Sequence, residues 1–225
     1  FDNNRLLFSC QSEDFYNIWF YYFDMEYDYG EPNHVIKRQD QFSKICANRA
    51  GGIRLLNQDS FEIIIKSIIL DYYKDKDKTR NLIDKISESI GKKHKNSLGE
   101  LNPIIWYSFP RAIDLLKNID KVKVKSDLKE RIKEASYYYS YKWIDLDFAK
   151  GISEYRGQEY LQSFDCINEV SSGYILLMAN HNLKCYPDDE NFINIIYDKS
   201  EDIDSWFSKI KNFYGIAYLY VMYES

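Results

Sequence analysis

Apolar residues at helical spacing run through most of this chain, and no other feature restricts its fold as strongly. The segment SFEIIIKSIILDYY, residues 60–73, is apolar on most faces and follows a predicted cap at Asp59 or Ser60, which indicates a buried central helix. Residues 126–151 also have strong helical periodicity. The one alternating segment, KVKVK at residues 121–125, is short and hydrophilic. We therefore expect an all-α fold in which short connections join the helices into a compact domain.

The size and composition of the chain restrict the kind of protein that it can be. It has 225 residues, of which 45% are hydrophobic, enough for one large domain or two lobes. No apolar run reaches the roughly 18 residues of a membrane-spanning helix, and no signal peptide is visible. We therefore expect a cytoplasmic, intracellular protein with no membrane partner. Because the sequence starts at Phe1 rather than Met, we also expect a fragment or a processed form of a longer protein.

The spacing of potential metal ligands argues against a metal site. The cysteines lie far apart without a C-x-x-C pair, and the histidines are isolated from one another. No glycine-rich nucleotide-binding motif occurs either. We expect reduced thiols, no metal and no cofactor. The residues concerned are Cys10, Cys46, Cys166, Cys185, His34, His94 and His181.

Charge is distributed unevenly along the chain. The net charge is −5, which argues against a strong non-specific grip on nucleic acid. Residues 64–150 nevertheless carry 19 Lys/Arg and 13 Asp/Glu, so the middle of the chain is basic and its ends are acidic. A solvated helical surface accounts for this segment, and so does a surface that contacts phosphates.

Two segments near the start of the chain carry a family resemblance. IWFYYFDMEYDYG, residues 18–30, is similar to the pattern W-x-x-Y-F-D-L-x-x-D-Y-G. GGIRLLNQDSFEIIIKSII, residues 51–69, is similar to G-[IV]-R-[IL]-L-x-Q-D-P-[FI]-E. In this order, both resemble the 8-oxoguanine DNA glycosylase/AP lyase family of the helix–hairpin–helix DNA glycosylase superfamily. Later segments follow more loosely, so that the resemblance spans roughly residues 12–225.

The resemblance implies a two-lobed helical fold with a cleft between the lobes. We expect one lobe over approximately residues 60–160 and another over 1–59 plus 161–225. In this family, DNA lies across the cleft and the target nucleotide swings out of the duplex. The family's small β-rich N-terminal domain has no counterpart in this sequence. Bifunctional members attack the sugar with a lysine amine and form a Schiff base, whereas members without that lysine use an aspartate and water.

The catalytic motif departs from the family pattern at its most important position. FDCINEV, residues 164–170, occupies the hairpin pattern L-P-G-V-G-x-K, so that Val170 replaces the catalytic lysine. Valine has no amine, and the resemblance therefore implies that lyase activity is absent. Asp189 matches the aspartate of the family's P-V-D segment. It would stabilise a cationic sugar or position water, or else it caps the helix that follows.

Other predicted site residues fall into a DNA-binding group and a base-pocket group. Aromatic and basic residues after the central helix are expected to meet bases and phosphates, although a solvated loop is the alternative. Cys166 and Asn168 replace the two hairpin glycines. In the last helix, Tyr218 and Met222 stand where the family places the residues that recognise the oxidised base. The DNA-binding predictions are Asn168, Tyr72, Tyr73, Lys74, Lys76 and Lys78, and the base-pocket predictions are Tyr174, Tyr218 and Met222.

Three functions are compatible with these residues. The first is a degenerate 8-oxoguanine DNA glycosylase-like protein that retains weak binding to double-stranded DNA. The second is an active monofunctional DNA N-glycosylase that uses Asp189. The third is a non-enzymatic protein-interaction module on the same fold, with an unknown partner. In each case we expect a monomer.

Overall fold

The computed structural model forms two compact units. One unit combines Phe1–Gln58 with Glu190–Ser225, and the other consists of the contiguous segment Asp59–Asp189. We call them the split unit and the central unit. Residues 161–187 were expected to join the lobe formed by the ends of the chain, whereas in the structure they belong to the central unit. The residues that the structure describes are 11–38, 53–95, 105–187, 190, 192, 194–195, 208–210 and 212–222.

The central unit is built around helix α5, as its sequence predicts. Asp59 is the N-cap, and its side chain accepts a hydrogen bond from the Glu62 amide. Ile64, Ile65 and Ile68 are fully buried, and burial of each such side chain contributes about 2 kcal/mol of transfer free energy. The elements of the unit are α5 (Ser60–Tyr73), α6 (Lys76–Ile90), β1 (Lys93–Lys95), β2 (Ile105–Tyr107), α7 (Ala112–Asn118), the 3-10 helix η2 (Ile119–Lys121), α8 (Ser126–Ser140), α9 (Leu146–Gly151), α10 (Glu154–Gln162) and α11 (Glu169–Asn180).

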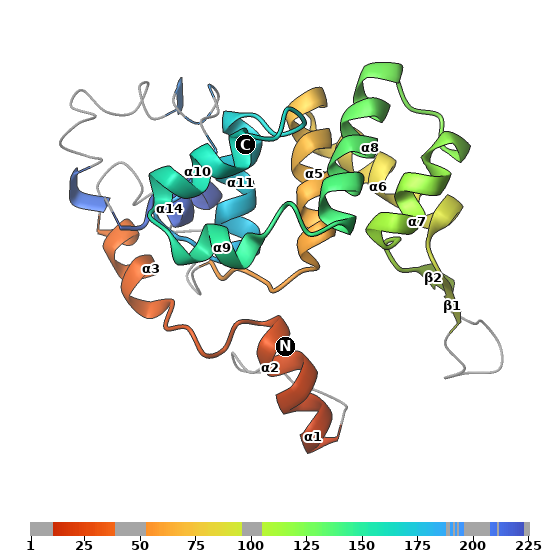
Figure 1. Ribbon diagram of the computed structural model, residues 1–225. Helices are drawn as coiled ribbons and strands as arrows, with labels where there is room; N and C mark the ends of the chain where they lie inside the picture. The colour runs from red at the N-terminus through yellow and green to blue at the C-terminus, as the bar shows by residue number, and fades with distance from the viewer. Residues whose placement is uncertain are drawn as a thin grey trace. The chain divides into compact units, whose positions relative to one another are not determined.

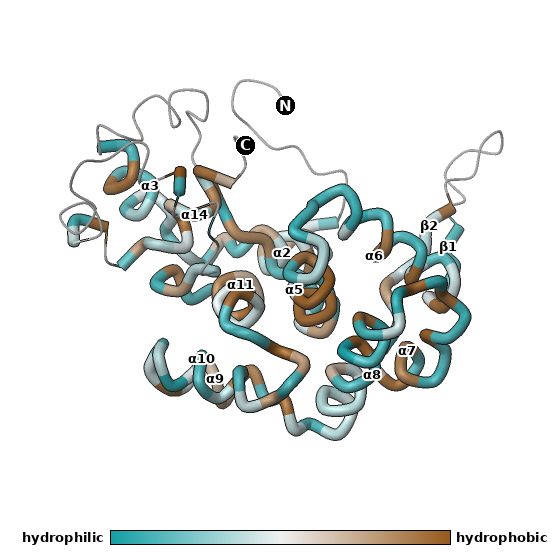
Figure 2. Tube along the Cα trace, turned by 90° about the horizontal axis from the view of Figure 1, so that it is seen from above, coloured by the Kyte–Doolittle hydropathy of each residue, from teal (hydrophilic) through white to brown (hydrophobic). Residues whose placement is uncertain are grey.

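Helices α6, α8 and α11 all pack against α5 (Figure 1). Figure 2 shows that α5 and α11 are largely hydrophobic, while α10 is mostly hydrophilic. The contact between α5 and α11 explains why residues 161–189 group with this unit. On α11, Ile175, Leu176 and Leu177 are buried.

The all-α prediction is confirmed, with one small addition. β1 and β2 form an antiparallel hairpin in which Lys93 pairs with Tyr107 and Lys95 pairs with Ile105. The alternating segment KVKVK is not a strand, because residues 119–121 form a 3-10 turn and Lys125 directly precedes α8.

The split unit draws on both ends of the chain. A hydrogen-bond network around Asn33 connects its segments: Asn33 donates to the Tyr29 and Ile53 carbonyls and accepts from Tyr220 Oη at 2.7 Å. Helix α14 thereby contacts α3. The elements of this unit are α1 (Ser12–Asp14), the π-helix η1 (Phe15–Trp19), α2 (Phe20–Tyr22), α3 (Gly30–Lys37) and α14 (Tyr214–Met222).

Among the described residues, none of the helices combines the length and the apolar character that a bilayer crossing requires.

Candidate nucleic-acid interface

A buried carboxylate lies at the C-terminal end of α5. The side chain of Asp71 is only 6% exposed, and an isolated charge in such a place is costly. Arg131 of α8 donates from Nη1 and Nη2 to Asp71 Oδ2, each at 3.0 Å. Lys74 donates from Nζ to Oδ1 at 2.7 Å. The carboxylate is therefore paired with two cations that come from different elements.

The same arginine also reaches the hairpin between α10 and α11. Arg131 donates from Nε and Nη2 to the Cys166 carbonyl, at 3.3 and 3.1 Å. The Asn168 side chain is hydrogen-bonded to Asp71 as well. The end of α5, the middle of α8 and the hairpin are thus joined by one polar network, which we call the Asp71 network: Asp71, Lys74, Arg131, Cys166 and Asn168.

The network keeps Asp71 ionised. Burial alone would raise the pKa of its carboxyl group, but hydrogen bonds from Asn168, Lys74 and Arg131 outweigh burial and hold the pKa below the ordinary value of 3.8. A carboxylate with these partners is negative at neutral pH. It therefore attracts the three donors under physiological conditions.

The hairpin is formed without glycine. Asn168 is the N-cap of α11: its Oδ1 accepts from the Ser171 amide, and Ser171 Oγ accepts from the Asn168 amide. The Asn168 backbone is extended, with φ −103°, so a left-handed residue is not required there. Cys166 is fully buried, and burial followed by the charge of Glu134 raises the pKa of its thiol to about 12. A protonated thiol at this position is a packing group rather than a nucleophile.

The turn between α5 and α6 carries most of the predicted DNA-binding residues. Tyr72 is half-buried, and its hydroxyl donates to the Asp127 carboxylate at 2.8 and 3.0 Å. The ammonium of Lys125 lies 5.7 Å from the centre of the Tyr72 ring, within cation–π range. Tyr73 packs edge-on against Tyr72, with 5.1 Å between ring centres.

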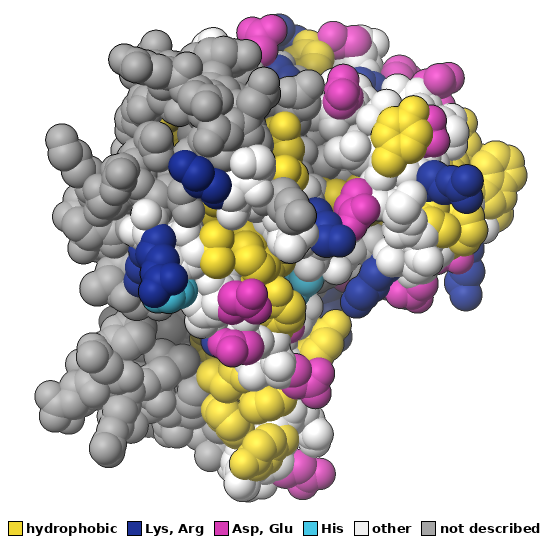
Figure 3. All heavy atoms as spheres, turned by 90° about the vertical axis from the view of Figure 1, so that its left-hand side faces the viewer, with side chains coloured by type: hydrophobic (Ala, Val, Ile, Leu, Met, Phe, Trp, Pro, Cys, Tyr) yellow, Lys and Arg dark blue, Asp and Glu magenta, His cyan; other side chains and the backbone are white. Residues whose placement is uncertain are grey.

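The lysines of this turn are exposed, but two of them already pair with carboxylates. Lys74, in a left-handed conformation with φ 50°, pairs with Asp71, and Lys78 pairs with Asp75 at 3.1 Å. Figure 3 shows that acidic and basic side chains are intermixed on one face of the molecule rather than gathered by sign. Of the predicted DNA-binding residues, the structure brings Tyr72, Lys74 and Asn168 together around the Asp71 network.

The sequence analysis missed Arg131 and Lys125. Both come from α8 or its cap, which are far along the chain from α5, so no local pattern indicates them. One signal was present: an aspartate within an otherwise apolar buried helix requires a cationic partner. That signal predicts that a partner exists but not which residue provides it.

Val170, which is predicted to replace the family's catalytic lysine, lies at the start of α11. Val170 is half-buried as the second residue of that helix. One turn later, Gly173 lies directly against the next loop, since a Cβ atom there would be 2.2 Å from the Tyr186 carbonyl oxygen and 3.1 Å from the Pro187 Cα atom. The backbone of residues 186–187 is therefore next to α11. Asp189 lies outside the described residues.

The predicted base-pocket residues belong to different units. Tyr174 is half-buried on α11 of the central unit. In the split unit, Tyr218 is buried and packs edge-on against Phe192, with 5.4 Å between ring centres, and Met222 is half-buried. A shared pocket for these side chains stays a prediction.

Comparisons with known proteins agree with the resemblance. A family model described as 8-oxoguanine DNA glycosylase, N-terminal domain, matches residues 4–64. The part of this range that the structure describes contains helices and no strand, and the expected lack of the family's β-rich domain stays a prediction. No curated protein matches the sequence.

Several solved structures share the fold. The apo-form of Clostridium acetobutylicum 8-oxoguanine glycosylase/lyase superimposes with a TM-score of 0.79 at 23% identity, over 97% of this chain and 78% of that chain. The same enzyme with dsDNA containing cytosine opposite 8-oxoG gives 0.78 at 22% identity, over 96% and 77%. The 3-methyladenine DNA-glycosylase from Archaeoglobus fulgidus gives 0.72 at 17% identity, over 96% and 78%. The predicted helix–hairpin–helix glycosylase-like fold is therefore confirmed.

Proposed function

We propose that this chain is a DNA glycosylase-like protein of the base-excision-repair type that binds duplex DNA and has lost the lysine-dependent lyase reaction. The observation that supports the proposal is the pair of helices α10 and α11 with the turn between them, where the family resemblance assigns Val170 to the position of the lysine. We expect such a protein to act inside the cell as a monomer.

The Asp71 network supports the DNA-binding part of this proposal. It joins the hairpin between α10 and α11 to the C-terminal end of α5, and so holds these two segments at a fixed distance from each other. The family resemblance places both segments at DNA. Next to this network, Tyr72 presents an aromatic ring, and the exposed Lys125 presents its ammonium group beside that ring. Rings of this kind stack on bases and ammonium groups contact phosphates. Among the similar structures, the Clostridium enzyme is bound to dsDNA.

The chemical part of the proposal follows from the side chain at position 170. Schiff-base formation requires an amine that attacks the sugar carbon, and valine has none. The glycosidic bond can still break if a carboxylate stabilises the cationic sugar and directs water to it. Asp189 is the candidate, because it follows Pro187 by two residues and the Pro187 backbone lies one helical turn from Val170. This packing favours an active monofunctional glycosylase as the second candidate function.

Lesion-bearing duplexes separate the degenerate protein from the active enzyme. The protein is incubated with duplexes that contain 8-oxoguanine, 3-methyladenine or uracil, and alkali then converts abasic sites into strand breaks. Strand breaks that disappear in Asp189→Asn establish an active glycosylase, and their absence with every lesion supports the degenerate protein. Borohydride is expected to trap no covalent adduct, because Val170 supplies no amine. A trapped adduct would show that another lysine reacts.

Salt-dependent binding tests the DNA contact itself. Duplex affinity is expected to fall steeply as salt increases, and Lys125→Ala should reduce the slope of log K against log salt by about 1. Lys117→Ala is the matched control, because Lys117 is an exposed lysine of α7 outside the interface. If intact and abasic duplexes are both ignored at low salt, a protein-interaction module becomes the better account.

A further inference from the structure

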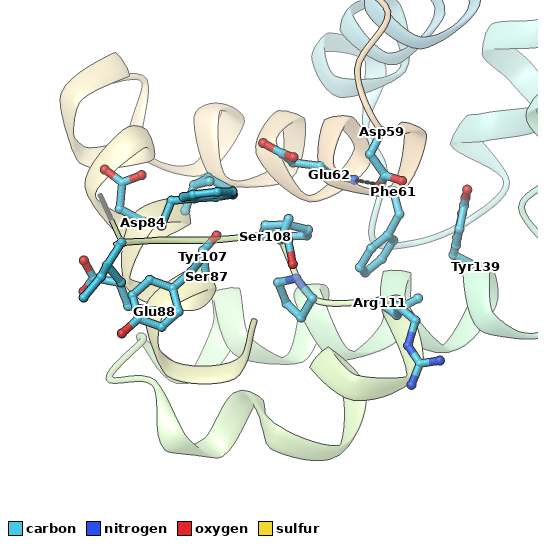
Figure 4. A pocket seen from close by; sticks show the side chains of 16 residues that line it. Asp59, Phe61, Glu62, Asp84, Ser87, Glu88, Tyr107, Ser108, Arg111 and Tyr139 are labelled. Carbon is cyan, nitrogen blue, oxygen red and sulfur yellow. Dashed lines mark hydrogen bonds between the residues drawn. The ribbon is translucent and has the colours of Figure 1, made fainter. Parts of the chain in front are cut away.

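A large hollow opens in the central unit beside the start of α5. Its volume is about 820 Å³, and it lies between the N-terminal end of α5, one face of α6 and strand β2. Figure 4 shows Asp84 and Glu88 toward one end and Arg111 and Tyr139 toward the other. A second hollow of about 550 Å³ shares Arg111 and Tyr139 with the first and continues to α9. Together they form one elongated depression, which we call the aromatic groove.

Aromatic side chains form the floor of this groove. Phe61 packs against Tyr139 and against Phe109, with ring centres 5.1 and 5.8 Å apart, so the floor is held in place by the core. Trp106 on β2 is 47% exposed and lines the first hollow. A hollow lined by aromatic side chains, one of them exposed, is typical of a site that binds another molecule.

Carboxylates surround the aromatic floor. Asp84 and Glu88 are exposed and lie one turn apart on α6, while Asp59 and Glu62 lie at the start of α5. Burial raises the pKa of the Glu62 carboxyl group, although the nearby Lys66 lowers it. Asp145 and Asp147 add two carboxylates in the second hollow, and the cations of the described lining are Arg111 and Lys142.

Among the described residues that line the first hollow, the one cationic side chain already has a carboxylate partner. Arg111 is the single Lys or Arg among the residues that line it, and its Nε and Nη2 donate to the Asp114 carboxylate at 2.7 and 3.3 Å. The carboxylates that line the two hollows outnumber Arg111 and Lys142, and this excess disfavours phosphates and favours cations.

The groove is well separated from the candidate nucleic-acid interface. The interface lies at the C-terminal end of α5, after Tyr73, whereas the groove begins at its N-cap, Asp59. A helix of this length spans roughly 20 Å. A molecule in the groove would therefore leave the interface accessible.

We infer that the aromatic groove docks an extended, lysine- or arginine-rich segment of a partner protein. Some cationic side chains of the segment would pair with Asp84 and Glu88 at one end of the groove, and others would place their charged groups over the rings of Trp106 and Tyr139. The elongated form suits an extended peptide, and the charge excludes nucleic acid as the occupant. The inference is independent of the proposed DNA chemistry, which belongs to the opposite end of α5.

Peptide binding to the full chain tests the inference. The probe is a fluorescein-labelled twelve-residue peptide of alternating lysine and serine, measured by fluorescence anisotropy at low and at physiological salt. The double variant Asp84→Asn/Glu88→Gln removes two exposed carboxylates and is expected to weaken binding by about threefold to tenfold. Trp106→Ala leaves the net charge unchanged and is expected to weaken binding by about threefold.

A control with the same net charge distinguishes the groove from general attraction between an acidic protein and a basic peptide. Asp120→Asn/Glu130→Gln also removes two exposed carboxylates, but these residues lie outside the groove. This control is expected to bind the peptide like the parent protein. Equal losses in both double variants, or no effect of Trp106→Ala, would overturn the inference.

Two further comparisons complete the test. Peptide binding is expected to persist even if the protein binds no duplex DNA, so that failure of the proposed function and failure of this inference are distinguishable. Displacement of the peptide by an equimolar amount of spermine would overturn the peptide assignment and indicate a site for a small polyamine.

Discussion

At the scale of single residues, the feature that needs most explanation is the aspartate in the last turn of α5. An apolar helix gains nothing from a buried carboxylate, and Asp71 is tolerated because Arg131 and Lys74 pair with it. The same carboxylate brings Asn168 of the hairpin into contact. Asp71 therefore acts as a junction between segments rather than as an isolated charge.

Loss of Arg131 should be costly. Arg131→Ala leaves a buried carboxylate and the Cys166 carbonyl without the arginine donors, and we expect the free energy of unfolding to fall by about 3 kcal/mol. Arg131→Lys keeps the charge but not the forked geometry, and should cost about 1 kcal/mol. Urea denaturation followed by circular dichroism measures both. A loss below about 0.5 kcal/mol in Arg131→Ala would show that the network contributes little.

The lowered pKa of Asp71 predicts a pH dependence. Since the pKa is lower in the folded than in the unfolded state, its stabilising contribution is complete above the ordinary value of 3.8 and is lost as the pH falls through the lower folded value. The stability difference between the parent protein and Asp71→Asn should therefore shrink when urea titrations are moved from pH 6 to pH 3. A difference that stays constant over this range would contradict the assignment.

At the scale of elements, the hairpin between α10 and α11 shows how side chains can replace glycine. Asn168 and Ser171 supply reciprocal caps, and Arg131 binds the Cys166 carbonyl. The capping pair makes the Asn168 amide a donor within the protein. Any phosphate contact at this hairpin must therefore use a different group from that amide.

At the same scale, Gly173 is a position where the packing of an element requires glycine. A Cβ atom there would overlap the Tyr186 carbonyl, and Gly173→Ala should lower the free energy of unfolding by about 2 kcal/mol through displacement of the loop. Gly151→Ala is the matched control, because no atom lies within 4 Å of its Cβ position. The control should be neutral or slightly stabilising by thermal denaturation. Equal melting temperatures for the two variants would contradict the close approach of loop and helix.

Helices were largely predictable from sequence, and their ends less so. Periodicity and the Asp59 cap predicted α5. The helix expected over 126–151 is instead two helices, because Lys142 adopts a left-handed conformation with φ 57° and interrupts it. A left-handed residue is difficult to predict from sequence when it is not a glycine, as here at Lys142.

The candidate site was predictable only in part, for a physical reason. Tyr72, Lys74 and Asn168 follow a motif order that can be read along the chain. Arg131 does not, because its pairing with Asp71 bridges 60 positions and depends on how α8 packs against α5. Long-range polar partners are set by helix packing, which periodicity alone does not determine.

At the scale of the whole molecule, the two units differ in how the chain builds them. The central unit is contiguous, and every member of its main buried cluster lies between Phe61 and Cys185. The split unit takes residues from both sides of the central one. We therefore expect the central unit to be stable by itself, whereas neither of the two chain segments that form the split unit should be stable alone.

A fragment tests this difference. Residues 59–189 expressed alone should show helical circular dichroism and a cooperative thermal transition, since they contain a complete core. Residues 1–58 alone should show neither, because Tyr220, which donates to Asn33, is missing. A central fragment that lacks near-ultraviolet dichroism would contradict the prediction.

The hydrogen bond from Tyr220 to Asn33 has a consequence for biosynthesis. A ribosome releases α3 early and α14 last, so the hydroxyl that completes the Asn33 network emerges only after the entire middle of the chain has left the exit tunnel. Domains tend to fold as units during translation. The central unit can therefore fold before the split unit is complete. A nascent chain that stalls before α14 would contain a folded central unit and an incomplete split unit. Chaperones bind incompletely folded segments of this kind.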